Sequence, residues 1–253
     1  NFDQIKSIEQ VAEAEVNSNN FKVTLTSGER FLLRRHIANL DIKVIERTFD
    51  IMEYLDSQGV QVPQIIKAVS GRRVLIIDGD PHTLFVFIEA DHYRGTGEEL
   101  ASAGKEIGRL DRALVNLPTS RDWEAELSLP LKAKELRVYN LAIWREIFAK
   151  ASVRAVSDPT DRFHADLLGQ EDFIFQMIEE TLATKPTQSI FGVVHFDLHP
   201  HNLLTNGEAV TAILDFDSLR YLECPRALAF ALHRLVRQYV IYNQRVDYTL
   251  AVP

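Results

Sequence analysis

His195-Phe196-Asp197-Leu198-His199-Pro200-His201-Asn202 and Ile213-Leu214-Asp215-Phe216-Asp217 are the two segments that decide the fold of this 253-residue chain. They place a carboxylate at Asp197, an amide at Asn202 and a second carboxylate at Asp215. Transfer of a phosphoryl group from Mg-ATP needs such a set, because one carboxylate orients the attacking hydroxyl while an amide and another carboxylate hold the metal ion. The pattern therefore indicates phosphoryl-transfer chemistry.

Short apolar runs surround these side chains. Val193-Val194 and Ile213-Leu214 predict strands, and Asn206-Gly207 is typical of a hairpin turn. The polar side chains then lie at strand ends and on a loop. We expect the hairpin to bring Asp197, Asn202 and Asp215 together.

The composition is that of an ordinary globular protein, with 46% hydrophobic and 25% charged residues. A formal net charge of −8 argues against a nucleic-acid partner, since phosphate backbones require clustered Lys and Arg. No apolar run approaches the length of a membrane span, and the first residues do not resemble a secretory signal. The single cysteine, Cys224, suits a reducing compartment, so we expect a cytoplasmic protein without membrane partners.

The first ninety residues predict a small strand-rich unit with one helix. Residues 21–25 and 30–35 alternate around a Ser27-Gly28 turn and predict a hairpin. Asp41 predicts the start of a helix whose apolar residues recur at helical spacing until Gly59. Residues 74–77 and 84–88 predict two buried strands.

The remainder predicts a mainly helical unit. Residues 91–97 are polar and indicate a linker. We expect helices over residues 100–114, 130–152, 165–184 and 227–236, on either side of the 195–217 stretch that carries the polar motifs. The predicted domains are an N-terminal nucleotide-binding lobe, 1–90, and a C-terminal catalytic and substrate-binding lobe, 91–253.

These motifs resemble the aminoglycoside phosphotransferase and choline kinase superfamily. The likeness extends beyond the decisive stretch to Phe31-Leu32-Leu33-Arg34 (third strand), residues 59–63 (helix-to-strand turn), Phe87-Ile88-Glu89 (hinge) and residues 107–110 (first C-lobe helix). It implies an α+β, protein-kinase-like fold with a small strand-rich N-lobe and a larger, mainly helical C-lobe. It also implies an ATP-dependent kinase that phosphorylates a small-molecule hydroxyl, such as that of an aminoglycoside, amino alcohol, homoserine or sugar.

The resemblance also implies roles for single residues. Asp197 would be the catalytic base or hydroxyl orienter, with His195 in the catalytic group chiefly as a brace of its loop. Asn202 and Asp215 would bind Mg²⁺, and Asp217 would be a second metal contact or a structural acceptor. The ATP site would use Arg34 for the phosphates and the backbone of Phe87, Ile88 and Glu89 for adenine.

The N-terminal part departs from the family pattern. Arg34 stands where a phosphate-binding lysine is usual, and Thr48 occupies the helix position where a glutamate would pair with it. Residues 13–20 contain no glycine and therefore no Gly-rich phosphate loop. These departures motivate one alternative, a kinase-like nucleotide-binding protein with weak or no catalysis.

A second alternative is a zinc metallohydrolase. His195, Asp197, His199 and His201 alternate, so on a continuous strand their side chains would share one face and form a zinc site. Pro200 argues against a central strand there, and this hypothesis leaves Asn202 and Asp215 without a role.

Overall fold

The computed structural model describes residues 4–11, 18–37, 41–118, 122–127, 141–158, 160–183 and 190–244. The chain forms two compact units. One consists of Asn1–Ser128 with Phe191–Val246, and the other of Leu129–Ile190 with Asp247–Pro253. Every residue predicted for the site lies in the first unit.

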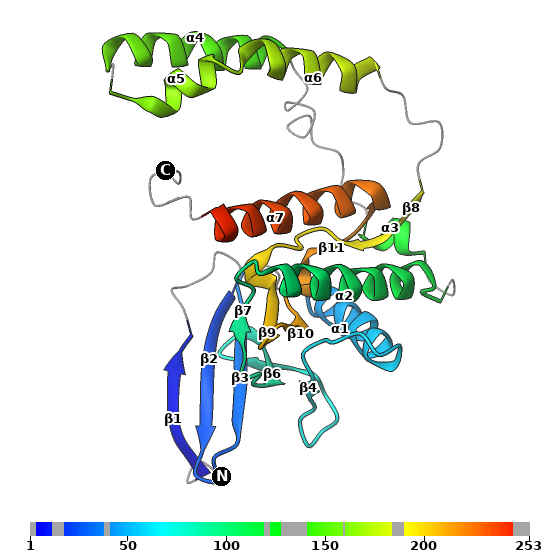
Figure 1. Cartoon of the computed structure of the whole chain (residues 1–253). Helices are drawn as coiled ribbons and strands as arrows, with labels where there is room; N and C mark the ends of the chain where they lie inside the picture. Colours follow the sequence, from blue (N-terminus) through cyan, green and yellow to red (C-terminus); the bar gives the residue numbers. More distant parts are fainter. Residues whose placement is uncertain are drawn as a thin grey trace. The chain divides into compact units, whose positions relative to one another are not determined.

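An antiparallel sheet opens the first unit, and β1, β2 and β3 run side by side in it (Figure 1). Among the described residues the strand order is β1-β2-β3-β6-β4, and β5 also pairs with β6. The strands are β1 (Ile5–Gln10), β2 (Ser18–Leu25), β3 (Arg30–His36), β4 (Ile65–Ile66), β5 (Val74–Ile77) and β6 (Asp80–Val86). The predicted hairpin is confirmed as β2–β3, with Gly28 of its turn at a φ of +93° that glycine adopts without strain.

Helix α1 (Ile42–Ser57) begins where the sequence predicts, because the Asp41 side chain accepts a hydrogen bond from the Lys43 N–H. Its buried face includes Phe49, whose ring meets that of Phe85 on β6 edge to face, with centroids 5.8 Å apart. The chain turns away from the helix at Gly59, where φ is +75°. The sheet and the helix are thereby packed together.

Two smaller sheets contain the strands of the 195–217 stretch and its neighbours. In the first, β9 (Leu203–Asn206) lies between β7 (Asp91–His92) and β10 (Ala209–Ile213). In the second, β8 (Phe191–His195) pairs with β11 (Leu219–Glu223). Two 3₁₀ turns, η3 (Pro200–Asn202) and η4 (Phe216–Ser218), follow β8 and β10 and carry polar residues of the predicted site.

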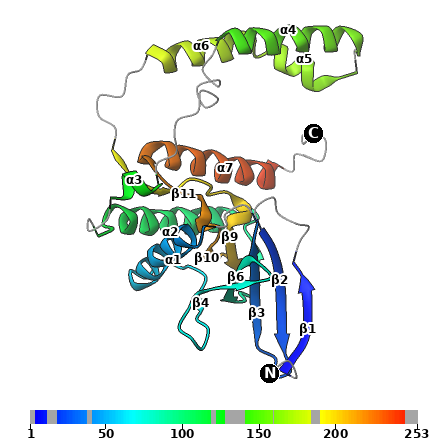
Figure 2. The same ribbon diagram turned by 180° about the vertical axis from the view of Figure 1, so that it is seen from behind.

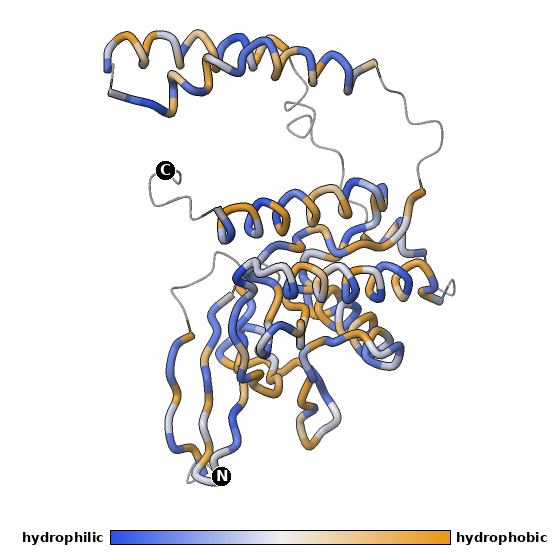
Figure 3. The backbone as a smooth tube through the Cα atoms, viewed as in Figure 1, coloured by the Kyte–Doolittle hydropathy of each residue, from blue (hydrophilic) through white to orange (hydrophobic). Residues whose placement is uncertain are grey.

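The longer helices of this unit pack in layers. Helix α2 (Gly97–Val115) lies between α1 and α7 (Cys224–Gln244), as Figure 2 shows from behind, and the short α3 (Trp123–Leu127) contacts β8 and β11. Hydrophilic and hydrophobic residues follow one another along α7 (Figure 3), of which Ala231 and Leu235 are buried. One continuous core joins α1, the sheets and these helices, from Phe49 and Leu55 to Ile213 and Leu235.

The second unit contains α4 (Leu141–Ser157), α5 (Arg162–Leu168) and α6 (Glu171–Ala183). Phe148 on α4 is buried and contacts the rings of Trp144 and Phe175, with centroid distances of 6.1 and 5.4 Å. The helices of the described residues include none that combines the length and the apolar character needed to cross a membrane.

Two details of the predicted elements are wrong. The helix expected over residues 165–184 is divided into α5 and α6, because the chain leaves α5 at Gly169. Strand β5 is buried only at Val74: Leu75, Ile76 and Ile77 are exposed, since within the described chain β5 pairs along one edge with β6. Residues 130–140 of another predicted helix lie outside the described residues.

Candidate active site

The chain between β8 and β9 is a loop and a 3₁₀ turn rather than a strand. His199 caps this turn, because its Nδ1 accepts the His201 N–H at 3.3 Å, and Pro200 occupies the first position of the turn. The alternating pattern from His195 to His201 therefore does not place the side chains on one face. Nowhere in the described ranges do three or more His, Cys, Asp or Glu side chains form a possible metal site, and the zinc hypothesis loses its geometric basis.

His195 is buried and braces two segments of the site. Its Nε2 lies 2.8 Å from the carbonyl oxygen of Leu214, and its Nδ1 accepts the Asp197 N–H at 3.3 Å. With Nδ1 as an acceptor, Nε2 carries the proton and donates to Leu214. The imidazole thus links the backbone of Asp197 to the residue that precedes Asp215, as expected for a brace.

Asn202 connects the same two segments from the other side. Its side-chain Nδ2 donates to the backbone carbonyl oxygen of Asp197 at 2.8 Å. The backbone carbonyl of Asn202 accepts the Leu214 N–H, also at 2.8 Å. Because Nδ2 is used in this way, the amide oxygen is the atom that remains for an external ligand.

Arg34 of β3 reaches the two carboxylates of the Asp215 segment. Its Nη2 lies 3.0 Å from Asp217 Oδ2 and 3.5 Å from Asp215 Oδ1, whereas its buried Nε has no hydrogen-bond partner among the described residues. Asp215 has a φ of +61° and a ψ of +52°, a left-handed conformation that Asp and Asn tolerate better than most residues. A phosphate group that displaced these carboxylates from Arg34 could bind the same guanidinium group.

Helix α1 supplies no acidic partner to Arg34. Thr48 is buried and its hydroxyl donates to the Val44 carbonyl at 3.2 Å. Three of the four acidic residues of this helix contact Arg73 instead, at 2.5 to 3.2 Å, and they are Glu46, Asp50 and Glu53. In place of the lysine–glutamate pair of protein kinases, this chain has an arginine that contacts Asp215 and Asp217.

A cavity of about 780 Å³ lies between the N-terminal sheet and the 199–217 region. That size and its largely apolar walls suit a small-molecule ligand such as a nucleotide. Of the predicted nucleotide-binding residues, Arg34, Phe87 and Ile88 line this cavity. Glu89 is not part of the lining and forms an ion pair with Arg30.

The predicted metal ligands, Asn202 and Asp215, line the same cavity, and so does Asp217. An amide oxygen and carboxylate oxygens are the donors that Mg²⁺ prefers, so this set fits the ion. Asp197 lies beside the cavity rather than in its wall. Its carboxylate is 42% exposed and lies 3.6 Å from Nε2 of His199, which does line the cavity.

Three histidines form one wall of the cavity. The rings of His199 and His201 have centroids 5.5 Å apart, and those of His201 and His92 are 6.0 Å apart. Burial lowers the pKa of His199, despite the neighbouring Asp197 carboxylate. Sequence reasoning missed His92, because residues 91–97 read as a linker and pairing of β7 with β9 is a long-range feature.

The two buried histidines predict a pH dependence of stability. Burial lowers the pKa of His195 and of His36 to about 4. A histidine in the unfolded chain has a pKa of about 6.5. The contribution of the two histidines to the free energy of unfolding is therefore fully present above that pH and is lost as the pH falls toward 4. We expect the free energy of unfolding, measured with urea from pH 8 to 5, to decline by up to roughly 1.4 kcal/mol per pH unit for each histidine.

His36→Gln is the control for this dependence. His36 contacts Thr83 at 3.2 Å and lies outside the catalytic segment. The variant removes one of these titrations, so its stability should decline less steeply below about pH 6.5 than that of the wild type. Equal slopes for the two proteins would contradict the explanation.

A profile of the phosphotransferase enzyme family matches residues 8–222. Homoserine kinase from Beijerinckia indica subsp. indica is 28% identical over 223 residues, which cover 87% of this chain and 60% of that protein. The chain thus spans about three fifths of the length of this relative.

Solved structures share the fold at low identity. An aminoglycoside phosphotransferase from Alicyclobacillus acidocaldarius subsp. acidocaldarius has a TM-score of 0.67 at 18% identity, over 98% of this chain and 71% of that one. A spectinomycin phosphotransferase in complex with ADP and spectinomycin has a TM-score of 0.61 at 19% identity, over 97% and 77% of the two chains. The predicted kinase-like α+β fold is confirmed.

Proposed function

The chain belongs to the phosphotransferase enzyme family, and on that basis we propose that it is a kinase that transfers the γ-phosphate of ATP to a hydroxyl group of a small molecule. The observation that carries the proposal is the arrangement of Asp197, Asn202 and Asp215. They are joined through His195 and Leu214 and lie in or beside one cavity. The lobes proposed for this enzyme are residues 1–90 and 91–253.

We propose that ATP occupies the 780 Å³ cavity. Phe87 donates its backbone N–H to the Arg30 carbonyl at 3.1 Å, so the adenine edge would meet the backbone of Ile88 or Glu89. The guanidinium of Arg34 would turn from Asp215 and Asp217 to the phosphates, and its unpartnered Nε would supply a further donor.

Asn202 and Asp215 would hold Mg²⁺, which neutralises charge on the phosphates when it is bound. Asp197 would accept a hydrogen bond from the acceptor hydroxyl, orienting its oxygen and removing its proton as the phosphoryl group transfers. His199 would steady the Asp197 carboxylate from 3.6 Å, and His195 would fix the Asp197 backbone.

The acceptor that we propose to test first is homoserine, because the similar protein from Beijerinckia indica is named a homoserine kinase. Purified protein with Mg-ATP should release ADP when homoserine is added, and phosphohomoserine should be detected by mass spectrometry. The matched control is 2-aminobutyrate, which has the same carbon skeleton without the hydroxyl and should not support ADP release. Aminoglycosides, amino alcohols and sugars complete the panel.

A kinase-like protein that binds nucleotide without transferring phosphate is the second candidate. It is favoured by the contact of Arg34 with both Asp215 and Asp217 and by Thr48 in place of an acidic partner. Binding of Mg-ATP without ADP release or phosphorylated product for any acceptor would support this candidate and contradict the kinase proposal. Absence of both binding and transfer would contradict the two together.

A further inference from the structure

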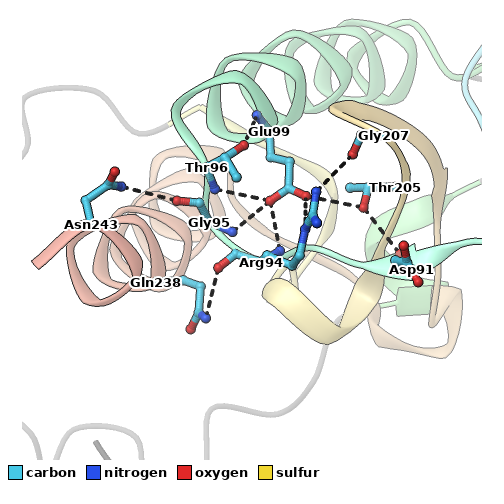
Figure 4. A network of polar contacts seen from close by, with 9 residues as sticks. All are labelled: Asp91, Arg94, Gly95, Thr96, Glu99, Thr205, Gly207, Gln238 and Asn243. Carbon is cyan, nitrogen blue, oxygen red and sulfur yellow. Dashed lines mark hydrogen bonds and ion pairs between the residues drawn. The ribbon is translucent and has the colours of Figure 1, made fainter. Parts of the chain in front are cut away.

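Glu99 is completely buried in the first turn of α2. Its Oε2 accepts the backbone N–H groups of Arg94, Gly95 and Thr96 at 2.9, 2.8 and 3.2 Å, as Figure 4 shows. Its Oε1 accepts from Arg94 Nε at 3.0 Å and lies 3.5 Å from the Thr205 hydroxyl. Burial raises the pKa of Glu99, but these hydrogen bonds outweigh it, and the net pKa is lowered.

Capping of the helix accounts for only part of this arrangement. The capping box of α2 requires the Thr96 N–H on Glu99 and the Glu99 N–H on the Thr96 hydroxyl, and both bonds are present. The other donors, from Arg94, Gly95 and Thr205, exceed what a helix N-terminus needs. Glu99 therefore gathers a whole segment, residues 94–96, around one carboxylate.

Helix α7 holds this segment from the other side (Figure 4). The Gln238 amide donates to the Arg94 carbonyl at 3.2 Å, and the Asn243 amide donates to that of Gly95 at 3.5 Å. Gly95 has a φ of +102°, and a Cβ there would lie 2.8 Å from the Gln238 carbonyl oxygen. Residues 94–96 are thus fixed between α2 and α7.

The same segment connects the two ends of the nucleotide cavity. It follows the hinge and β7, whose Asp91 and His92 pair with Thr205 and Leu204 of β9. Strand β9 begins directly after Asn202, the proposed metal ligand. The Thr205 hydroxyl lies 3.4 Å from the Asp91 carbonyl, and Arg94 Nη2 donates to the Gly207 carbonyl at 3.4 Å.

We propose that Glu99 is a positioning residue for the kinase reaction. It fixes residues 91–96, which follow the hinge in the chain, to β9. It thereby sets the distance between the adenine end and the metal end of the cavity. Glu99 does not line the cavity and would touch neither nucleotide nor acceptor. The inference rests on the proposed function, because the geometry that it maintains is that of the ATP site.

The test compares Glu99→Gln with Glu106→Gln. Glu106 is a matched control, since it is also a buried glutamate of α2 with an arginine partner, but within the described structure its carboxylate bonds to Arg109 rather than to residues 91–96. Both variants should lower the thermal midpoint. Only Glu99→Gln should lower kcat/KM for ATP, by about tenfold to a hundredfold, and speed amide exchange at residues 94–96.

Arg94→Met is the second variant and serves if Glu99→Gln does not fold. Its side chain is half exposed, and the substitution removes the Nε and Nη2 bonds while the three backbone donors to Glu99 remain. It should raise KM for ATP in the same direction, by a smaller factor.

Unchanged kinetics for ATP in folded Glu99→Gln, or in Arg94→Met where that variant replaces it, would overturn the positioning role. Equal kinetic losses in Glu99→Gln and Glu106→Gln would also overturn it, because they would indicate a general loss of stability. If the wild type binds Mg-ATP without turnover, the proposed function fails by itself. The Glu99 inference is then decided by whether Glu99→Gln weakens that binding while Glu106→Gln does not.

Discussion

Replacement of Asp197 by asparagine is expected to lower kcat by roughly a thousandfold while leaving the binding of Mg-ATP nearly unchanged. General-base catalysis contributes about 10² to 10⁴ to the rate of such reactions, and an amide cannot accept the proton of the attacking hydroxyl. The fold should tolerate the change. Asp197 is held by its backbone, which bonds to His195 and Asn202, and its carboxylate is 42% exposed.

The control for this substitution is Asp56→Asn, at an exposed position of α1 that does not line the cavity. It makes the same chemical change and should retain wild-type turnover. The measurements are steady-state ADP release and the rise of the thermal midpoint with Mg-ATP. An Asp197→Asn enzyme that keeps a third or more of its kcat would remove Asp197 from the role of base.

Local signals predicted the elements that the structure confirms. The Asp41 cap and the turn at Gly28 each depend on a few neighbouring residues, so the sequence contains all the information that they need. The exposure of β5 depends instead on how β6 pairs with the rest of the sheet, and the pairing of β6 with β3 joins residues far apart in the chain. For this reason the apolar residues of an edge strand are predicted from the sequence to be buried, as those of a central strand are.

The site residues likewise fall into those that the local sequence predicts and those that depend on contacts between distant segments. Asp197, Asn202 and Asp215 were predicted because they lie within one short stretch, and the hairpin that joins them is local. The contacts of Arg34 with Asp215 and Asp217, and those of Arg73 with α1, join residues that are twenty or more positions apart. No spacing rule reports such pairs. The same reason explains why His92 gave no signal and why the contact of Glu99 with Thr205 gave none, although Thr96 and Glu99 match the local capping-box pattern.

The position of Glu89 illustrates a finer limit. Its place in the hinge motif predicted a nucleotide contact, but its side chain pairs with Arg30 and is not part of the cavity lining. A motif specifies where the backbone runs, whereas the direction of each side chain depends on its neighbours in space. The proposed contact of Glu89 with adenine is therefore one of backbone atoms, as the resemblance implies.

Replacement of Asp215 by asparagine is expected to abolish the Mg²⁺-dependent part of the thermal stabilisation by ATP and to lower kcat/KM for ATP by at least about a hundredfold. Asparagine is the right substitution, because Asp215 has a φ of +61° and asparagine tolerates that conformation better than alanine. The change then removes the negative charge and one of the two carboxylate oxygens, leaving only a neutral amide oxygen for the metal ion, without straining the backbone. The measurement is the thermal midpoint against ATP concentration, with Mg²⁺ and with EDTA.

The chain offers a matched control in Asp78, the other non-glycine residue of the described ranges with a positive φ, +54°, which does not line the cavity. Asp78→Asn should keep the full Mg²⁺-dependent shift. A full shift in Asp215→Asn would contradict the assignment of the metal to Asp215. In that case Asp217→Asn decides between the two acids, because Asp217 also lines the cavity and also contacts Arg34. Loss of the shift there would assign the metal to Asp217 and leave Asp215 as a partner of Arg34.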